Sequence, residues 1–239
     1  MNNKDVIAVV GVGPSLGSAV ARRFAGAGFA TALLARGTST TRPLARELQH
    51  AGHEAAALEM DATVPDSVEH AFAEIGYRFG SSPSVLVYNA GTFVIGQVAD
   101  IAPNDFERCW RINCMGGFLA AKAALGPMLD AGHGTIIFTG ATASLRGGKG
   151  FANLAVGKFG LRALAQSLAR EVGPQGIHVA HAIIDGQIDT PTIRERQPER
   201  ETHTLLAPDA IAETYLALHR QDRTAWTLEL DLRPAVESF

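Results

Sequence analysis

The chain has 239 residues, of which 46% are hydrophobic and 19% are charged, a composition that fits one globular domain with a single core. Its formal net charge is −3 and no run of Lys or Arg stands clear of acids, so no nucleic-acid partner is expected. The apolar start at residues 6–10 is too short to span a bilayer and leads into a glycine turn, so neither a membrane segment nor a signal peptide is predicted.

Short apolar runs rich in Val and Ile alternate with longer segments of helical period, the pattern of a parallel sheet with helices on both faces. Residues 1–239 are therefore predicted to form one doubly wound α/β domain of the Rossmann type. Right-handed crossovers give a seven-stranded sheet with the order 3-2-1-4-5-6-7. The predicted strands are residues 6–10, 29–35, 54–59, 85–89, 134–139, 178–184 and 226–232.

The first strand runs into Gly11-Val12-Gly13-Pro14-Ser15-Leu16-Gly17, ahead of a predicted helix at residues 16–25. Its glycines allow a tight turn and let backbone N–H groups approach a pyrophosphate at the helix N-terminus. Ser15 is a good helix N-cap, and its hydroxyl is also within reach of such a phosphate. The alternative is a strand-to-helix turn without a ligand.

The second strand ends at Ala35-Arg36. An NAD site usually offers an acid here to bond the ribose 2′-hydroxyl. Ala35 takes the place of that acid, and Arg36 leaves room and donors for a 2′-phosphate. The sequence therefore predicts that NADP(H) is preferred over NAD(H), the alternative being a solvated strand-end arginine.

Polar residues mark the rest of the chain. Asp61 follows the third strand, Asn89-Ala90-Gly91 closes the fourth, and Asn113 lies inside a helix, where Asn is a poor helix former. Lys158 lies early in an apolar helix at about residues 151–172, where a buried ammonium needs partners unless it reaches solvent.

The cysteines and histidines do not predict a redox or metal site. The only cysteines, Cys109 and Cys114, lie five apart in a helical pattern, which is typical of reduced thiols in a cytoplasmic protein. The eight histidines are scattered, and His178 and His181 point to opposite faces of one strand, so no metal is expected.

Together, the glycine turn, Asp61, Asn89-Ala90-Gly91, Asn113 and Lys158 resemble the short-chain dehydrogenase/reductase family over nearly the whole length. In that family a Tyr-x-x-x-Lys pair acts with a serine about a dozen residues upstream. Here Leu154 stands four positions before Lys158, and Ala141 falls at the serine position. The resemblance therefore implies an atypical member that lacks both catalytic hydroxyls. No tyrosine lies between residues 141 and 158, and the longer Tyr-x6-Lys spacing of the related enoyl reductases falls on Phe151.

The resemblance also implies roles for the polar residues. Asp61 would bond the adenine amine, although it is equally suited to cap the next helix. The motif at residues 89–91, in which Tyr88 replaces a first asparagine, would line the adenine ribose. The carbonyl of Asn113 would hold a water joined to Lys158, which would bond the nicotinamide ribose. The other implied cofactor contacts are Leu16, Ala62, Gly186, Ile188 and Thr190.

Three sources of the missing proton remain open. Asp185, at the proline position of the family's Pro-Gly motif, is one, because an apolar site can raise a carboxyl pKa. The water held by Asn113 and Lys158 is the second, and a hydroxyl of Thr142 or Ser144 is the third. Residues 190–207 stand at the position of the family's substrate lid, and their Arg194, Arg196 and Arg200 would form a solvated face or bind an anionic substrate.

Two functions follow. The first is an NADP(H)-dependent oxidoreductase that acts on a small or medium carbonyl compound or alkene. The second is a sensor or assembly protein that binds the cofactor without turnover. A homodimer or homotetramer is expected in either case, because apolar residues cover more than one face of the helices that carry Asn113 and Lys158.

Overall fold

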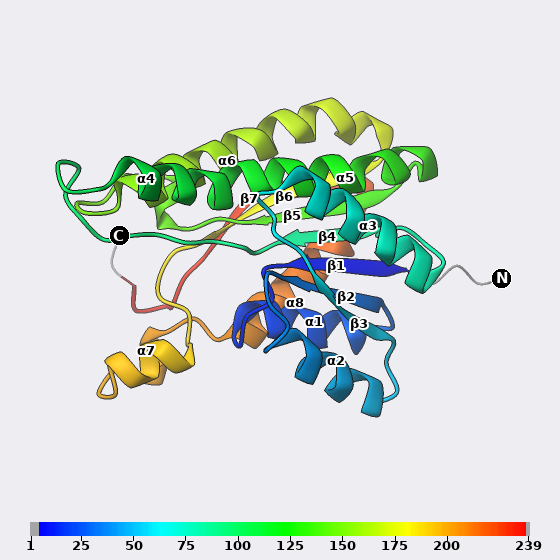
Figure 1. The fold of residues 1–239 in the computed structure, drawn as a ribbon, viewed down its shortest axis with the longest axis horizontal. Coiled ribbons are helices and arrows are strands. Elements are labelled where there is room, and N and C mark those ends of the chain that lie inside the picture. The colour runs from blue at the N-terminus through cyan, green and yellow to red at the C-terminus, as the bar shows by residue number, and fades with distance from the viewer. Residues whose placement is uncertain (1–4, 238–239) are drawn as a thin grey trace.

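A computed structural model describes residues 5–237, which form one parallel sheet with the strand order β3-β2-β1-β4-β5-β6-β7 (Figure 1). The fold class and the strand order predicted from the sequence are confirmed. The strands are β1 (Val6–Val10), β2 (Ala30–Ala35), β3 (Ala55–Glu59), β4 (Val85–Tyr88), β5 (Gly134–Thr139), β6 (Ile177–Ile184) and β7 (Glu229–Leu232).

The last strand is shorter than predicted. Residues 226–228 precede it, because Trp226 stacks flat on the ring of His178 at a centroid distance of 4.9 Å. The backbone N–H of Thr227 donates to the side-chain oxygen of Gln221 over 2.8 Å, so that group is bonded outside the sheet. The other six strands agree with the prediction to within one residue at each end.

Helices cover both faces of the sheet. The α-helices are α1 (Leu16–Ala25), α2 (Thr41–His50), α3 (Pro65–Phe79), α4 (Pro103–Trp110), α5 (Gly116–Ala131), α6 (Ala152–Val172), α7 (Pro191–Arg196) and α8 (Pro208–His219). Figure 1 shows α3, α5 and α6 on one face and α1, α2 and α8 on the other, with α7 lying away from the sheet. The buried apolar side chains accordingly form two clusters, one on each side of the sheet.

A π-helical turn, Arg111–Met115, joins α4 to α5 and carries Asn113 at its centre. A π turn inserts one residue into a helix and often marks a functional site. Tyr88, at the end of β4, is buried beneath it and donates its hydroxyl proton to the Ile112 carbonyl over 2.5 Å. A Cβ atom at Gly116 would lie 2.3 Å from that hydroxyl oxygen, so only glycine fits there beside the tyrosine.

The continuous helical stretch Pro103–Ala131 is also long and apolar enough to cross a membrane, with a mean hydropathy of 1.2 in a window that is 39% buried. Length and composition alone are weak grounds for a membrane segment. Ala120, Ala121 and Ala124 of α5 are buried in the core, and α5 packs against β4 and β5. This stretch is thus placed as a core helix of the domain.

Candidate cofactor and substrate site

The glycine turn after β1 is built for close backbone approach. Gly11 has a φ of +87°, and a Cβ atom there would lie 2.4 Å from the backbone nitrogen of Ala90. A Cβ atom at Gly17 would lie 2.7 Å from the Gly11 carbonyl oxygen, whereas nothing lies within 4 Å of one at Gly13. Asn89 donates to the same Gly11 carbonyl over 3.0 Å. The turn is therefore locked to the end of β4 and open at Gly13.

Ser15 does not act as the predicted cap. It occupies the N-cap position of α1, but its side chain makes no capping bond there and donates instead to the Asp189 carbonyl over 3.1 Å. A helix whose first N–H groups lack a side-chain cap keeps them available for an anion. The turn thus fits a pyrophosphate, and Ser15 ties it to the loop after β6. Leu16 is buried in the core, so only its backbone can face a ligand.

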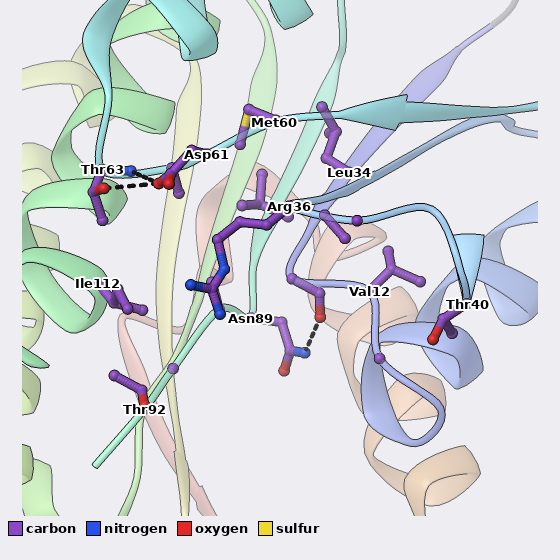
Figure 2. Close-up of a pocket in the computed structure, with 18 of the residues that line it drawn as sticks. Val12, Leu34, Arg36, Thr40, Met60, Asp61, Thr63, Asn89, Thr92 and Ile112 are labelled. Carbon is purple, nitrogen blue, oxygen red and sulfur yellow. Dashed lines mark hydrogen bonds between the residues drawn. The ribbon is translucent and has the colours of Figure 1, made fainter. Parts of the chain in front are cut away.

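A cavity of about 390 Å³ lies along the carboxyl ends of β1, β2, β3 and β4, where ligands of open α/β sheets bind. It brings together eight residues predicted as cofactor contacts, namely Gly11, Gly13, Arg36, Asp61, Ala62, Asn89, Ala90 and Gly91. Figure 2 shows the Arg36 guanidinium extending from the end of β2 into the space between Ile112 and Val12.

Four hydroxyl-bearing residues that line this cavity, Ser39, Thr40, Thr63 and Thr92, were not predicted from the sequence. Ser39 and Thr40 line it just before α2 begins at Thr41. The sequence feature that could have predicted Ser39 and Thr40 is the run Thr38-Ser39-Thr40-Thr41 directly after Gly37. Hydroxyl groups at a helix N-terminus beside an arginine are suited to bind a phosphate. They extend the donor set around Arg36.

Asp61 organises the loop rather than capping α3, whose N-cap position is Val64. Its Oδ1 accepts from the backbone N–H of Thr63 over 2.9 Å and from the Thr63 hydroxyl over 2.7 Å (Figure 2). Burial raises the pKa of Asp61, but the bonds from Thr63 and the charge of Arg36 outweigh it and leave that pKa below its usual value. A carboxylate in this cavity can accept from an amine.

A second cavity, of about 420 Å³, is lined by Asn113, Ala141, Leu154 and Lys158, four of the five residues predicted for the reaction site, and Asp185 is not among its lining residues. Its remaining lining residues are Gly91, Thr92 and Phe93. Gly91 and Thr92 also line the first cavity, so the two meet there. Nothing in the sequence pattern had indicated Phe93 as a site residue.

Lys158 is 5% exposed, and its Nζ donates to the Thr139 carbonyl over 2.7 Å. Across residues 5–237 no carboxylate pairs with it. Burial lowers the pKa of Lys158 to about 8, because the charged form loses its hydration. The alternative of a lysine that reaches solvent does not hold in this structure.

Two buried asparagines fix the segment that follows Gly91. The Asn113 amide donates to the carbonyls of Thr92 and Cys109 over 2.6 and 2.9 Å, and its oxygen accepts from the Thr92 N–H over 3.2 Å. Asn153 repeats this at Val94, donating to its carbonyl over 2.7 Å and accepting from its N–H over 3.2 Å. Asn153 was not recognised in the sequence, where it stands beside Leu154 without a motif of its own.

The other candidate proton donors are engaged elsewhere. Thr142 donates to Asp185 over 2.5 Å, and the second oxygen of Asp185 lies 3.2 Å from Arg233. One oxygen of Asp185 therefore accepts a hydrogen bond and the other pairs with a guanidinium, which suits an anchor for its loop better than a proton donor.

Ser144 lies 3.3 Å from a ring nitrogen of His181, which is fully buried. Burial and the nearby charge of Lys158 lower the pKa of His181 to about 4. The ring is therefore neutral near pH 7, and Ser144 is held against it rather than facing the cavity that Lys158 lines.

The loop after β6 leads into the stretch predicted as a lid. Gly186 has a φ of +144°, Ile188 pairs with Leu206 in an isolated bridge, and the Thr190 hydroxyl caps α7 by accepting from Ile193 over 3.1 Å. These three predicted cofactor residues do not line either cavity described above.

Two of the arginines predicted to form a solvated face or to bind an anionic substrate are bonded to nearby residues instead. Arg194 makes two bonds of 2.7 Å to Asp189, and Arg200 binds Gln187 and Thr204. Both arginines therefore tie the stretch to the residues just before it, and Arg200 also bonds within it.

Comparison with known proteins adds the family context. The family model described as short chain dehydrogenase matches residues 5–201. A 3-alpha-(or 20-beta)-hydroxysteroid dehydrogenase of Mycobacterium tuberculosis is 35% identical over 134 residues, which are 56% of this chain and 51% of that protein. The chain thus spans about half the length of this curated relative.

Solved structures match over nearly the whole chain. A short-chain dehydrogenase from Rhodopseudomonas palustris is 36% identical with a TM-score of 0.83, covering 96% of this chain and 98% of its own. An alcohol dehydrogenase from Thermococcus sibiricus, complexed with 5-hydroxy-NADP, is 26% identical with a TM-score of 0.88, covering 98% of each chain.

Proposed function

Because this chain belongs to the short-chain dehydrogenase family, we propose that it is an atypical NADP(H)-dependent oxidoreductase, which interconverts a carbonyl compound and an alcohol without the family's serine and tyrosine. The observation that carries the proposal is the pair of adjoining cavities, one fitted to a dinucleotide and the other lined by Asn113, Ala141, Leu154 and Lys158.

The residues of the first cavity fit a nicotinamide dinucleotide. Gly11 and Gly17 let the turn pack closely on the protein backbone, Gly13 leaves it open, and the uncapped α1 N-terminus would offer N–H groups to the pyrophosphate. Asp61, Arg36, Ser39 and Thr40 all line this cavity, so Asp61 would accept from the adenine amine and the other three would surround a 2′-phosphate. When bound, the nicotinamide supplies or accepts the hydride.

In the second cavity Lys158 is the residue from which a proton can come. Asp185, Thr142 and Ser144 are bonded to one another or to buried groups, whereas one bond to Thr139 leaves two Lys158 N–H groups free. Lys158 would bond the ribose hydroxyls and would give a proton, through a water, to the oxygen of the reduced substrate. Ala141 and Leu154 take the places of the serine and the tyrosine, and residues 190–207 act as the lid.

A second candidate is a cofactor-binding sensor or assembly protein without turnover. The apolar side chains of Ala141 and Leu154 favour it, because neither offers a proton. Assaying NADPH oxidation with a panel of ketones and aldehydes separates the two functions. Binding of NADPH without oxidation on any member of the panel would support the sensor.

NADPH is expected to bind more tightly than NADH by about tenfold to a hundredfold, because a charge-assisted contact to the 2′-phosphate is worth roughly 1.5 to 3 kcal/mol. Fluorescence titration of both cofactors measures this. Arg36→Ala should abolish the preference, and Arg46→Ala, at an exposed site of α2 outside the cavity, should keep it. Equal affinities in the unaltered protein would contradict the assignment.

We also propose a homodimer or homotetramer in a reducing, cytoplasmic compartment. Phe118 of α5 and Phe159 of α6 are 44% and 43% exposed, and Cys109 and Cys114 are free thiols. Light scattering at micromolar concentration should give a dimer or tetramer, and Phe118→Glu with Phe159→Glu should lower the mass to that of a monomer. A monomeric unaltered protein would count against the proposal.

A further inference from the structure

The cavity beside Lys158 has an apolar wall that the mechanism does not use. Phe93 lines it together with Ala141 and Leu154, and its ring lies 5.8 Å from the ring of Phe151. Phe93 is 51% exposed, so part of its surface is open to a ligand. From this wall we infer that the substrate is an uncharged carbonyl compound or alcohol with an aromatic or alicyclic body that stacks on Phe93. The inference rests on the proposed function and names its substrate class.

The wall is held rigidly by backbone bonds. Thr92 is bound through both its N–H and its carbonyl to Asn113, and Val94 is bound in the same way to Asn153. The N–H of Gly96 donates to the Gly150 carbonyl over 3.1 Å. Thr92, Val94 and Gly96 are thus all held by backbone hydrogen bonds. The loop that carries Phe93 is therefore already ordered before a ligand binds. A prearranged wall saves the entropy that ordering it would cost a ligand.

Once Lys158 is assigned to the cofactor ribose, no charged side chain that lines the cavity is left to hold an anionic substrate. Lys158 is the charged side chain among the lining residues, and it is bound to Thr139 and assigned to the ribose. Arg194 and Arg200, which the sequence offered as anion partners, are bound to Asp189 and Gln187. A carboxylate on the substrate would lose its hydration without gaining a charged partner in the cavity. An uncharged ring avoids this cost in binding free energy.

The size of the cavity sets the scale of the substrate. Its volume of about 420 Å³ falls within the range of roughly 300 to 1,000 Å³ for small-molecule sites. Part of this space belongs to the cofactor, because Lys158 is assigned to its ribose, and a substrate of about one ring fits the remainder. A flat ring also suits the face of an aromatic side chain, since offset stacking adds to the burial of apolar area.

The test uses two probes that share one ring and one ketone and differ in charge, acetophenone and 4-acetylbenzoate. Their binding to the NADP⁺-loaded protein is measured by calorimetry, where the oxidised cofactor prevents reduction of the ketone. Acetophenone is expected to bind at least about tenfold more tightly than 4-acetylbenzoate. Phe93→Ala should weaken acetophenone binding by about tenfold or more, because it removes the apolar surface that the ring covers.

Val98→Ala is the matched control, since Val98 is 77% exposed in the same loop and does not line the cavity. It should bind acetophenone as the unaltered protein does. Tighter binding of 4-acetylbenzoate, equal effects of the two variants, or no binding of either probe would each overturn the inference. The NADP⁺ titration is a separate measurement. Loss of cofactor binding with acetophenone binding retained would refute the proposed function and leave the substrate class standing.

Discussion

Leu154→Tyr combined with Ala141→Ser is expected to raise the rate of NADPH-dependent ketone reduction by about two to four powers of ten, the contribution of a positioned general acid. Both positions line one cavity with Asn113 and Lys158, so the new phenol would stand beside a buried ammonium. That charge lowers the pKa of a nearby phenol and makes it a better acid near neutral pH. The larger ring should cost about 1 to 3 kcal/mol of stability through overpacking.

Leu154→Phe with Ala141→Ser is the matched control, because it adds the same ring without the hydroxyl. Turnover of NADPH on a panel of ketones and aldehydes is compared among the three proteins after their cofactor affinities have been measured. A gain in the tyrosine variant alone assigns the effect to the proton donor. A folded, cofactor-binding tyrosine variant without any gain would mean that the substrate cavity no longer supports reduction, and would favour the sensor.

Lys158→Met is expected to stabilise the ligand-free protein at pH 7 by about 2 kcal/mol while removing turnover. Burial lowers the pKa of Lys158 from its usual 10.5 to about 8, and at about 1.4 kcal/mol per pKa unit the buried ammonium costs roughly 3 kcal/mol. Methionine fills a similar volume without the charge. It loses the bond to the Thr139 carbonyl, worth about 1 kcal/mol.

The stability difference should depend on pH in a defined direction. Between pH 8 and pH 10.5 the unfolded chain keeps the Lys158 proton and the folded protein does not, so the unaltered protein gains stability over this window as the pH rises. Below pH 8 the full cost of the charge is present, and above 10.5 it is gone. The advantage of Lys158→Met should therefore shrink across this window and end as a small deficit.

Urea denaturation at pH 7, 9 and 10.5 measures this difference. Lys122→Met, at an exposed site of α5, is the control and should show no comparable pH dependence. A destabilised Lys158→Met variant at pH 7 would contradict the prediction. It would mean that partners of the ammonium offset its burial in solution.

The sequence predicted the fold well because its period was unambiguous. Apolar runs such as Val6–Val10 are buried along their whole length, as a central parallel strand requires. The end of β7 was harder to predict, since Trp226 has a strand-like pattern but stacks on His178. Side-chain contacts of this kind depend on residues far apart in the chain.

The site residues could be predicted where backbone geometry requires a particular residue. They were harder to predict where a side chain has several possible hydrogen-bond partners. No residue other than glycine fits at position 11 beside Ala90, so the glycine turn could be recognised in the sequence. Ser15 had two nearby options and instead bonds Asp189, which lies 174 positions away. Asn153 serves a segment 59 residues earlier, and no local pattern distinguishes it from a solvent-exposed asparagine. Contacts over such separations exist only in the folded chain.

The packing of Tyr88 against Gly116 restricts which residues can occupy these two positions together. A methyl group at position 116 would collide with the tyrosine hydroxyl and would lie 3.0 Å from the Ala62 carbonyl. Loss of the phenol ring would remove the first of these conflicts and leave the second, softer one. Positions 88 and 116 should therefore covary among homologues, with alanine or serine at 116 appearing only in lineages where a smaller residue already occupies 88.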